Sequence, residues 1–186
     1  QAYKEEWDDF LGKSKVNCFL LQRDYMEYHA DRFEDFSLII FNDKNNVVAI
    51  FPANRIENTV YSHQGLTYGG LITDYDSKVQ NYMEYFEVIN SFLLDEGINK
   101  VVYKKLPYIY SEFPNDEDEY CLFRLGAKNI TCGISSTIKL NENFKYNTLR
   151  KRSVKKAGKF DLTLNVEEDF RTFWEILEEN LRLTHY

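Results

Sequence analysis

Residues Thr59–Ile72, TVYSHQGLTYGGLI, are the stretch on which the fold of this 186-residue chain depends. Asn58–Ser62 has the β-branched and aromatic composition of a strand, and three glycines then interrupt the pattern between positions 65 and 70. Glycine allows sharp turns and a close approach of the backbone to a ligand. The stretch therefore predicts a strand followed by a loop, and this loop carries His63, Gln64 and Tyr68 as candidate ligand contacts.

Two further strands are predicted before this stretch. Ser37–Phe41 and Val47–Phe51 are rich in β-branched and aromatic residues, and the five residues between them, 42–46, have the composition of a turn. Strand runs joined by a short turn are typical of an antiparallel hairpin. Pro52 limits pairing at the end of the second run. Together with Asn58–Ser62, the two runs predict an antiparallel meander.

A long helix and another strand follow the loop. Apolar residues recur with a helical period over Asp76–Glu96, and Ser77 and Gln80 have the spacing of a capping box. Lys100–Leu106 then has the composition of a strand. Because a helix separates it from the third strand of the meander, the two strands are expected to pair in parallel through a right-handed crossover.

The remaining elements before residue 144 are shorter. In chain order they are a helix ending near Gly12, an extended segment at Val16–Leu21, a helical turn within Arg23–Phe33, a helix at Asp116–Leu125 and a strand at Ile130–Leu140. The acidic run 116–119 suits a helix N-terminus, where carboxylates interact favourably with the helix dipole, better than it suits a cation site. The predicted fold class is α/β (α+β): a mixed sheet with an antiparallel meander and one parallel βαβ crossover.

The composition changes after residue 143. Lys145–Phe160 contains seven basic residues and no acidic one, and its apolar residues share a helical face. A predicted strand at Asp161–Val166 and an amphipathic helix around Trp174 follow it. We therefore predict a first domain at 1–143 and the beginning of a second domain at 144–186, truncated at Tyr186.

Composition restricts the class of protein. A hydrophobic content of 44% is enough for a buried core, and a net charge of -7 argues against nucleic-acid binding through overall attraction to phosphate. The three cysteines are widely separated among apolar residues, which indicates reduced thiols rather than a disulfide framework or a zinc site. No run approaches the roughly 20 apolar residues of a membrane span, so a cytoplasmic protein without membrane insertion is expected.

The motif content argues against several kinds of catalytic site. His63 has no aspartate close in sequence, and the chain lacks the glycine-x-serine-x-glycine elbow of Ser/His hydrolases. A satisfied loop histidine is favoured over a catalytic base at this position, and both remain open. Three histidines without paired spacing predict no metal site. Gly65–Gly70 lacks the spacing and the lysine ending of nucleotide-binding loops.

Two further groups of side chains are candidates for ligand binding. The basic segment could meet the phosphates of a nucleotide-linked substrate, a coenzyme or an RNA, and a solvated lysine face is the alternative. Its phosphate-binding candidates are Arg150, Arg152, Lys155 and Lys156. Lys104 and Tyr108 flank the end of the crossover strand, where α/β sheets commonly place ligands.

Three segments resemble a known family. Ser135–Phe160, SSTIKLNENFKYNTLRKRSVKKAGKF, is similar to the segment of FemAB-like proteins in which a strand leads into a basic helix of the form R-x-x-x-x-K-A. The pattern W-x-x-F…N-x-F-L-L-Q-R-x-Y between Trp7 and Tyr25 and the stretch Tyr61–Gly70 are similar to the first domain of that family. FemAB-like proteins belong to the GNAT superfamily of N-acyltransferases.

The resemblance implies a bacterial transferase with a GNAT-like fold that moves an acyl or aminoacyl group to an amine. The acyl donor would be acetyl-CoA, another thioester or a charged tRNA, and the acceptor a cell-envelope or polysaccharide precursor held largely by the first domain. The candidate acceptor contacts are Arg23, Tyr25, His63, Gln64, Tyr68, Lys104 and Tyr108. No catalytic residue and no oligomeric state follow from the sequence.

One junction departs from the family pattern. GNAT acetyltransferases hold the coenzyme pyrophosphate with a glycine-rich loop, whereas residues 71–76 here read LITDYD, with two acids and no glycine after Gly70. The acyl donor is therefore expected to bind mainly outside this chain, and the chain alone to be inactive. The alternative is a non-catalytic domain of the same fold that binds a glycan or a nucleotide-sugar through its tyrosines.

Overall fold

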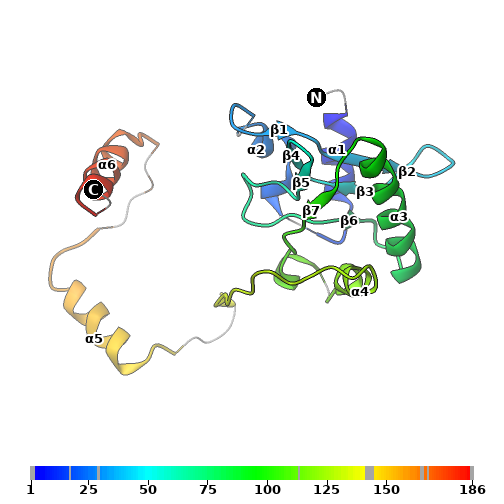
Figure 1. The fold of residues 1–186 in the computed structure, drawn as a ribbon. Helices are drawn as coiled ribbons and strands as arrows, with labels where there is room; N and C mark the ends of the chain where they lie inside the picture. The colour runs from blue at the N-terminus through cyan, green and yellow to red at the C-terminus, as the bar shows by residue number, and fades with distance from the viewer. Residues whose placement is uncertain are drawn as a thin grey trace. The chain divides into compact units, whose positions relative to one another are not determined.

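The computed structural model describes residues 3–16, 18–28, 30–112, 114–140, 145–163, 166 and 168–184, and the chain divides into two units, Gln1–Thr131 and Cys132–Tyr186. The first unit is mixed α/β (Figure 1). Its helices are α1 (Lys4–Gly12), η1 (Phe19–Leu21), α2 (Arg23–Glu27), α3 (Val79–Asp95), η2 (Tyr108–Tyr110) and α4 (Glu117–Arg124). Its strands are β1 (Glu34–Asp35), β2 (Leu38–Phe41), β3 (Val47–Phe51), β4 (Asn54–Ile56), β5 (Thr59–Tyr61), β6 (Ile72–Thr73) and β7 (Lys100–Val102). The domain boundary after residue 143 stays a prediction.

The predicted hairpin is confirmed, and it is longer than the sequence pattern indicates. β2 pairs antiparallel with β3. β1 pairs with β4 in the same register, with Asp35 opposite Asn54, so that β1–β2 and β3–β4 form the two arms of one long hairpin. The pairing continues beyond Pro52, because the Phe36 N–H donates to the Ala53 carbonyl (2.9 Å). β4 is therefore an element that the sequence pattern does not predict.

The strands β5 and β6 pair antiparallel with the second arm of this hairpin. β5 pairs with β4, with Tyr61 opposite Asn54, and β6 pairs with β3, with Ile72 opposite Ile50. Between these two pairs of residues, the arm formed by β3 and β4 contains three residues, 51–53, whereas the chain from β5 to β6 contains ten, 62–71. The segment 62–71 therefore connects two sheets, one with the strand order β1-β4-β5-β7 and one with the order β2-β3-β6. It contains the glycine-rich loop on which the sequence prediction rests.

The predicted parallel crossover is confirmed. β5 and β7 pair in parallel, with Val60 opposite Val101, and α3 lies between them in the chain. β7 ends at Val102 instead of continuing to Leu106. The predicted capping box of α3 is wrong by one residue: Asn81 Oδ1 accepts the N–H of residue 78 at 3.0 Å.

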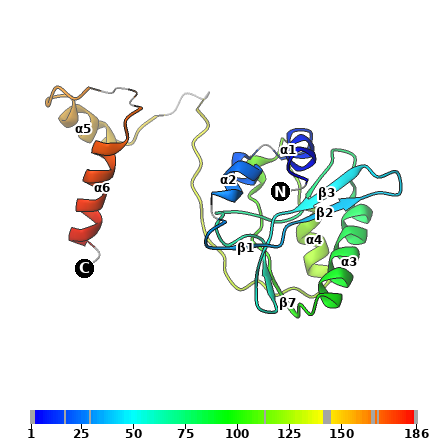
Figure 2. The same cartoon turned by 90° about the horizontal axis from the view of Figure 1, so that it is seen from above.

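Helices cover both faces of the strands, as the view in Figure 2 shows for α1 on one side and α3 on the other. Along β3, Ala49 and Phe51 join the buried cluster of α3, whereas Ile50 joins the cluster of α1. This alternation follows from the two-residue period of a strand. In the α1 cluster the indole N–H of Trp7 donates to the Leu21 carbonyl (2.8 Å). Each large apolar side chain buried in these clusters contributes about 1.5–3 kcal/mol, which fixes both helices to the sheet.

The strand predicted at Ile130–Leu140 is wrong. These residues form no strand, and Ile134 is 99% exposed and Leu140 94% exposed. A strand requires a neighbour that satisfies its N–H and C=O groups, and an apolar sequence cannot supply one. Within the strand predicted at Asp161–Val166, residues 164 and 165 lie outside the described residues, and residues 161–163 and 166 form no strand.

The second unit contains the helices α5 (Thr148–Ala157) and α6 (Arg171–Thr184). Asn147 caps α5, since its Oδ1 accepts the Arg150 N–H at 2.8 Å. Both helices expose large apolar side chains, among them Leu149 on α5 and Trp174 on α6. Throughout the described ranges, no helix combines the length and the apolar character needed to cross a membrane.

Candidate functional site

The loop 62–71 is closed at its base by Lys104. The Lys104 N–H donates to Ser62 Oγ (2.6 Å), and the Gly69 N–H donates to the Lys104 carbonyl (3.1 Å). Lys104 Nζ also donates to the Leu66 carbonyl within the loop. A compact loop whose ends lie together in this way is an Ω-loop, a class that often carries function.

Two adjacent glycines permit the loop to return to the sheet. A Cβ atom on Gly69 would lie 2.1 Å from the Ser62 carbonyl oxygen. Gly70 has a φ of 108°, and a Cβ atom there would lie 2.7 Å from the hydroxyl of Tyr103. Residues with a side chain rarely adopt this φ and would not fit the space. The glycines are therefore required by close backbone packing inside the protein.

His63 and Gln64 fix the start of the loop. His63 has a φ of 60°, is 3% exposed, and packs edge-on against Phe33 with 5.7 Å between ring centres. The Gln64 N–H donates to Asn54 Oδ1 (2.6 Å), and Asn54 Nδ2 donates to Gln64 Oε1 (2.9 Å). Because Asn54 is fully buried, these bonds satisfy an amide that would otherwise be costly. The side chain of His63 therefore points into the protein, whereas Gln64 is exposed at the surface of the loop.

The tyrosines predicted as ligand contacts do not form one group. Tyr68 packs against Tyr110, with ring centres 5.4 Å apart. Burial raises the pKa of Tyr110, and the neighbouring Tyr68 raises it further. Tyr108 is 64% exposed on η2, and Tyr25 on α2 packs edge-on against Phe19. Tyr110, which is not among the predicted site residues, is thus the tyrosine that meets the loop.

Arg23 is an internal structural residue. Its guanidinium pairs with Asp35 (2.5 Å) and Glu27 (3.6 Å) and lies over the ring of Trp7. Burial alone would raise the pKa of Asp35, but hydrogen bonds from Arg23 and Ser37 outweigh it and lower that pKa. The charge of Arg23 is thus used to join α2 to β1.

A second polar group, absent from the sequence prediction, lies where the loop rejoins the sheet. The Tyr103 hydroxyl accepts the Leu71 N–H (2.8 Å) and donates to Asp118 Oδ2 (2.9 Å). Burial raises the pKa of Asp118 and raises that of Tyr103 well above its ordinary value. Lys105 lies 3.9 Å from Asp118 and also pairs with the neighbouring acids Asp116 and Glu119. The acidic run 116–119 therefore provides both the start of α4 and the ion-pair partners of Lys105.

The raised pKa of Asp118 gives a pH prediction. Asp118 binds its proton more tightly in the folded protein than in the unfolded chain, so its contribution to stability is present below pH 3.8 and is lost as pH rises through the folded pKa. Replacing Asp118 by asparagine should remove this loss. Urea unfolding measured from pH 3.5 upward should show the wild type falling progressively relative to Asp118→Asn.

The control for this experiment is Asp116→Asn, because the Asp116 side chain is 72% exposed. This variant should follow the pH profile of the wild type more closely. A difference between Asp118→Asn and the wild type that stays constant with pH would contradict the assignment.

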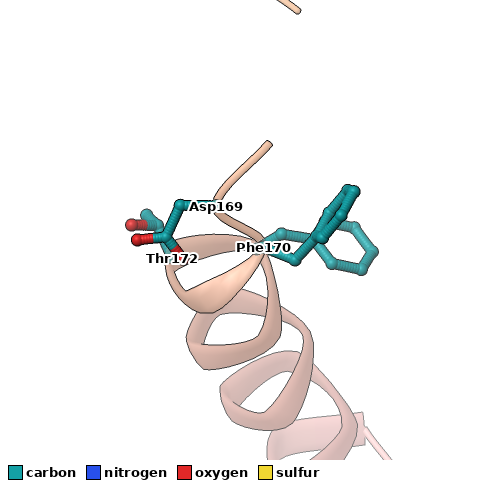
Figure 3. Close-up of a pocket in the computed structure, with 4 residues that line it drawn as sticks. Asp169, Phe170 and Thr172 are labelled. Atoms are coloured by element: carbon teal, nitrogen blue, oxygen red, sulfur yellow. The ribbon is translucent and has the colours of Figure 1, made fainter. Parts of the chain in front are cut away.

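Neither of two cavities in the described parts encloses a substrate. One of about 20 Å³ has Gly69, Leu71, Tyr103 and Asp118 in its wall, which is space for about one water molecule. A larger hollow of about 580 Å³ lies at the start of α6, but it is lined only by Asp169 and Phe170, which precede the helix, and by Thr172 and Phe173 of its first turn (Figure 3). One helix cannot enclose a ligand, so we assign the candidate site to the loop surface.

The basic candidates lie in the second unit. Arg150, Arg152, Lys155 and Lys156 are all exposed on α5. No cluster of three or more metal-ligating His, Cys, Asp or Glu side chains occurs in the ranges that the structure describes. Comparison of the chain with family models, curated proteins and solved structures finds no match.

Proposed function

We propose that the first unit forms the acceptor-binding side of an N-acyltransferase, which transfers an acyl or aminoacyl group to an amine of a cell-envelope or polysaccharide precursor. The position of the loop 62–71 supports this most directly. The parallel strands β5 and β7 end at Tyr61 and Val102, and the loop and Lys104 follow immediately. In open α/β sheets, ligands commonly bind outside the carboxyl ends of parallel strands.

The chemistry requires few groups from this unit. An amine that attacks a thioester or an aminoacyl ester needs positioning, stabilisation of the oxyanion and removal of a proton. Gln64 and Tyr68 supply polar and aromatic surface for the acceptor, and Lys104 holds the loop. His63 is buried and is given no catalytic role. The base remains unassigned.

We place the acyl donor mainly outside the first unit. A cavity of about 20 Å³ cannot admit the arm of a coenzyme, which is consistent with the acids at Asp74 and Asp76 in place of a phosphate loop. The proposed donor is acetyl-CoA, another acyl thioester or aminoacyl-tRNA. Its phosphates would meet the exposed basic side chains Arg150, Arg152, Lys155 and Lys156.

A second candidate function is glycan or nucleotide-sugar binding without transfer. The Tyr68–Tyr110 pair favours it, because small-molecule sites are lined largely by aromatic and apolar side chains with a few polar groups. The two functions share the acceptor site and differ in whether transfer follows binding.

The test separates acceptor binding from transfer. UDP-glucosamine, which offers an amine on a nucleotide-linked sugar, and acetyl-CoA are each titrated into the protein by calorimetry. Tyr68→Ala should weaken binding of the sugar up to about tenfold, because an aromatic contact contributes about 0.5–1.5 kcal/mol, and should not affect acetyl-CoA. The control Tyr120→Ala removes an exposed tyrosine of α4 and should change neither titration.

Acetyl or aminoacyl transfer to the amine would support the transferase. Binding of the sugar that depends on Tyr68, without transfer from acetyl-CoA or charged tRNA, would favour the second candidate. Sugar binding that Tyr68→Ala leaves unchanged would count against both.

A further inference from the structure

Two neighbouring lysines after β7 have opposite surroundings. Lys105 Nζ lies within ion-pair distance of Asp116, Asp118 and Glu119. Lys104 Nζ donates to the Leu66 carbonyl, and no carboxylate of the described residues lies within ion-pair distance of it. The difference arises because successive side chains of an extended segment point to opposite sides.

The surroundings determine the chemistry of each amine. Burial lowers the pKa of Lys104, which favours the neutral amine. Burial also acts to lower the pKa of Lys105, but hydrogen bonds to Glu119 and Asp116 and the charges of Asp118 and Glu119 outweigh it and raise that pKa. A lysine amine that is desolvated and has no acidic partner is an activated nucleophile. Lys104 is also partly exposed.

We propose that Lys104 is an acylation site for small acyl thioesters, and that its acylation releases the loop 62–69. The neutral Nζ attacks the carbonyl carbon of the thioester, and the carbon–sulfur bond breaks. The thiolate leaves with the electron pair, and the proton lost by nitrogen passes to the thiolate or to solvent. The product is an uncharged secondary amide and a free thiol.

Acylation acts on the loop because Lys104 holds it in two ways. The backbone N–H and C=O of Lys104 bind Ser62 and Gly69 at the base of the loop, and acylation leaves these groups intact. Nζ binds the Leu66 carbonyl at the middle of the loop, and an acyl group adds bulk and removes the charge at this contact. The expected product keeps its fold while residues near Leu66 separate from the Lys104 side chain. This inference does not depend on the proposed function.

The first test compares the acetylation of Lys104 with that of Lys105 in the same folded protein. The protein is incubated with acetyl-CoA at pH 8, and acetylation of Lys104 and Lys105 is quantified by tandem mass spectrometry. The three ion pairs of Lys105 stabilise its protonated amine, which cannot attack a thioester. We therefore expect Lys105 to be acetylated roughly tenfold more slowly than Lys104. In about 8 M urea, which unfolds the protein, the ratio of Lys104 acetylation to Lys105 acetylation should fall to about one. Equal acetylation of the two lysines in the folded protein would overturn the assignment.

The second test concerns release of the loop. Lys104→Gln imitates the uncharged acylated side chain, and Lys104→Arg keeps a charged donor. Amide hydrogen exchange of residues 62–69 should be about tenfold faster in Lys104→Gln and close to the wild-type rate in Lys104→Arg, since a charge-assisted hydrogen bond is stronger than a neutral one. Equal exchange in the two variants would show that the charge of Lys104 does not hold the loop.

Discussion

Replacing Gly69 by alanine is expected to lower the free energy of unfolding by about 3 kcal/mol or more. The new Cβ would lie 2.1 Å from the carbonyl oxygen of Ser62, which is backbone and cannot move aside as a flexible side chain would. Relief requires the base of the loop to open and costs the hydrogen bond from the Gly69 N–H to the Lys104 carbonyl. Urea unfolding followed by tryptophan fluorescence measures the loss.

Gly12→Ala is the matched control, because no atom lies within 4 Å of the Cβ that it would add at the end of α1. It should change stability by less than about 1 kcal/mol and in the stabilising direction. If Gly69→Ala unfolds at the same urea concentration as Gly12→Ala, the close approach of the loop to Ser62 is wrong.

Replacing Tyr103 by phenylalanine is expected to cost about 2–4 kcal/mol. The ring can still pack between Phe51 and Phe86, so the loss comes from the hydroxyl group. Without it, the Leu71 N–H loses its acceptor and the buried Asp118 carboxylate loses a donor. The return of the loop to β6 and the start of α4 should both loosen, which hydrogen exchange at Leu71 can detect together with urea unfolding.

Tyr85→Phe is the control for this prediction. The Tyr85 hydroxyl makes a long contact of 3.4 Å with Ser77 Oγ, so its removal should cost less than about 1 kcal/mol. Equal losses in the two variants would mean that Tyr103 does not connect the loop to α4 through its hydroxyl.

Much of the fold could be predicted from local pattern. The β2–β3 hairpin and the helix α3 follow from strand runs around a turn and from a 3.6-residue period, and the parallel pairing of β5 with β7 follows from the helix between them. The sequence pattern did not predict the strands correctly where pairing depends on a partner that is distant in sequence. Ile130–Leu140 has the composition of a strand but no neighbour, and β4 pairs although Pro52 precedes it.

The candidate site was only partly predictable, because its contacts join residues distant in sequence. The glycine loop could be recognised by composition, but the distinction between a buried His63 and an exposed Gln64 depends on Phe33 and Asn54. Similarly, nothing in the sequence distinguishes Arg23 as an internal ion pair from a ligand-binding arginine. Its partner Asp35 lies on another element.

The sequence by itself determined that Thr59–Ile72 is a strand interrupted by a glycine loop, since glycine content and strand composition are local properties. Only the tertiary structure decided how that loop is held. Asn54 meets it from β4, and Tyr103 and Lys104 meet it from the segment after β7, which the crossover brings beside β5. The adjacent Lys104 and Lys105 acquire different chemistry for the same reason: the extended segment after β7 directs them to opposite sides, and the fold places Asp116, Asp118 and Glu119 beside Lys105.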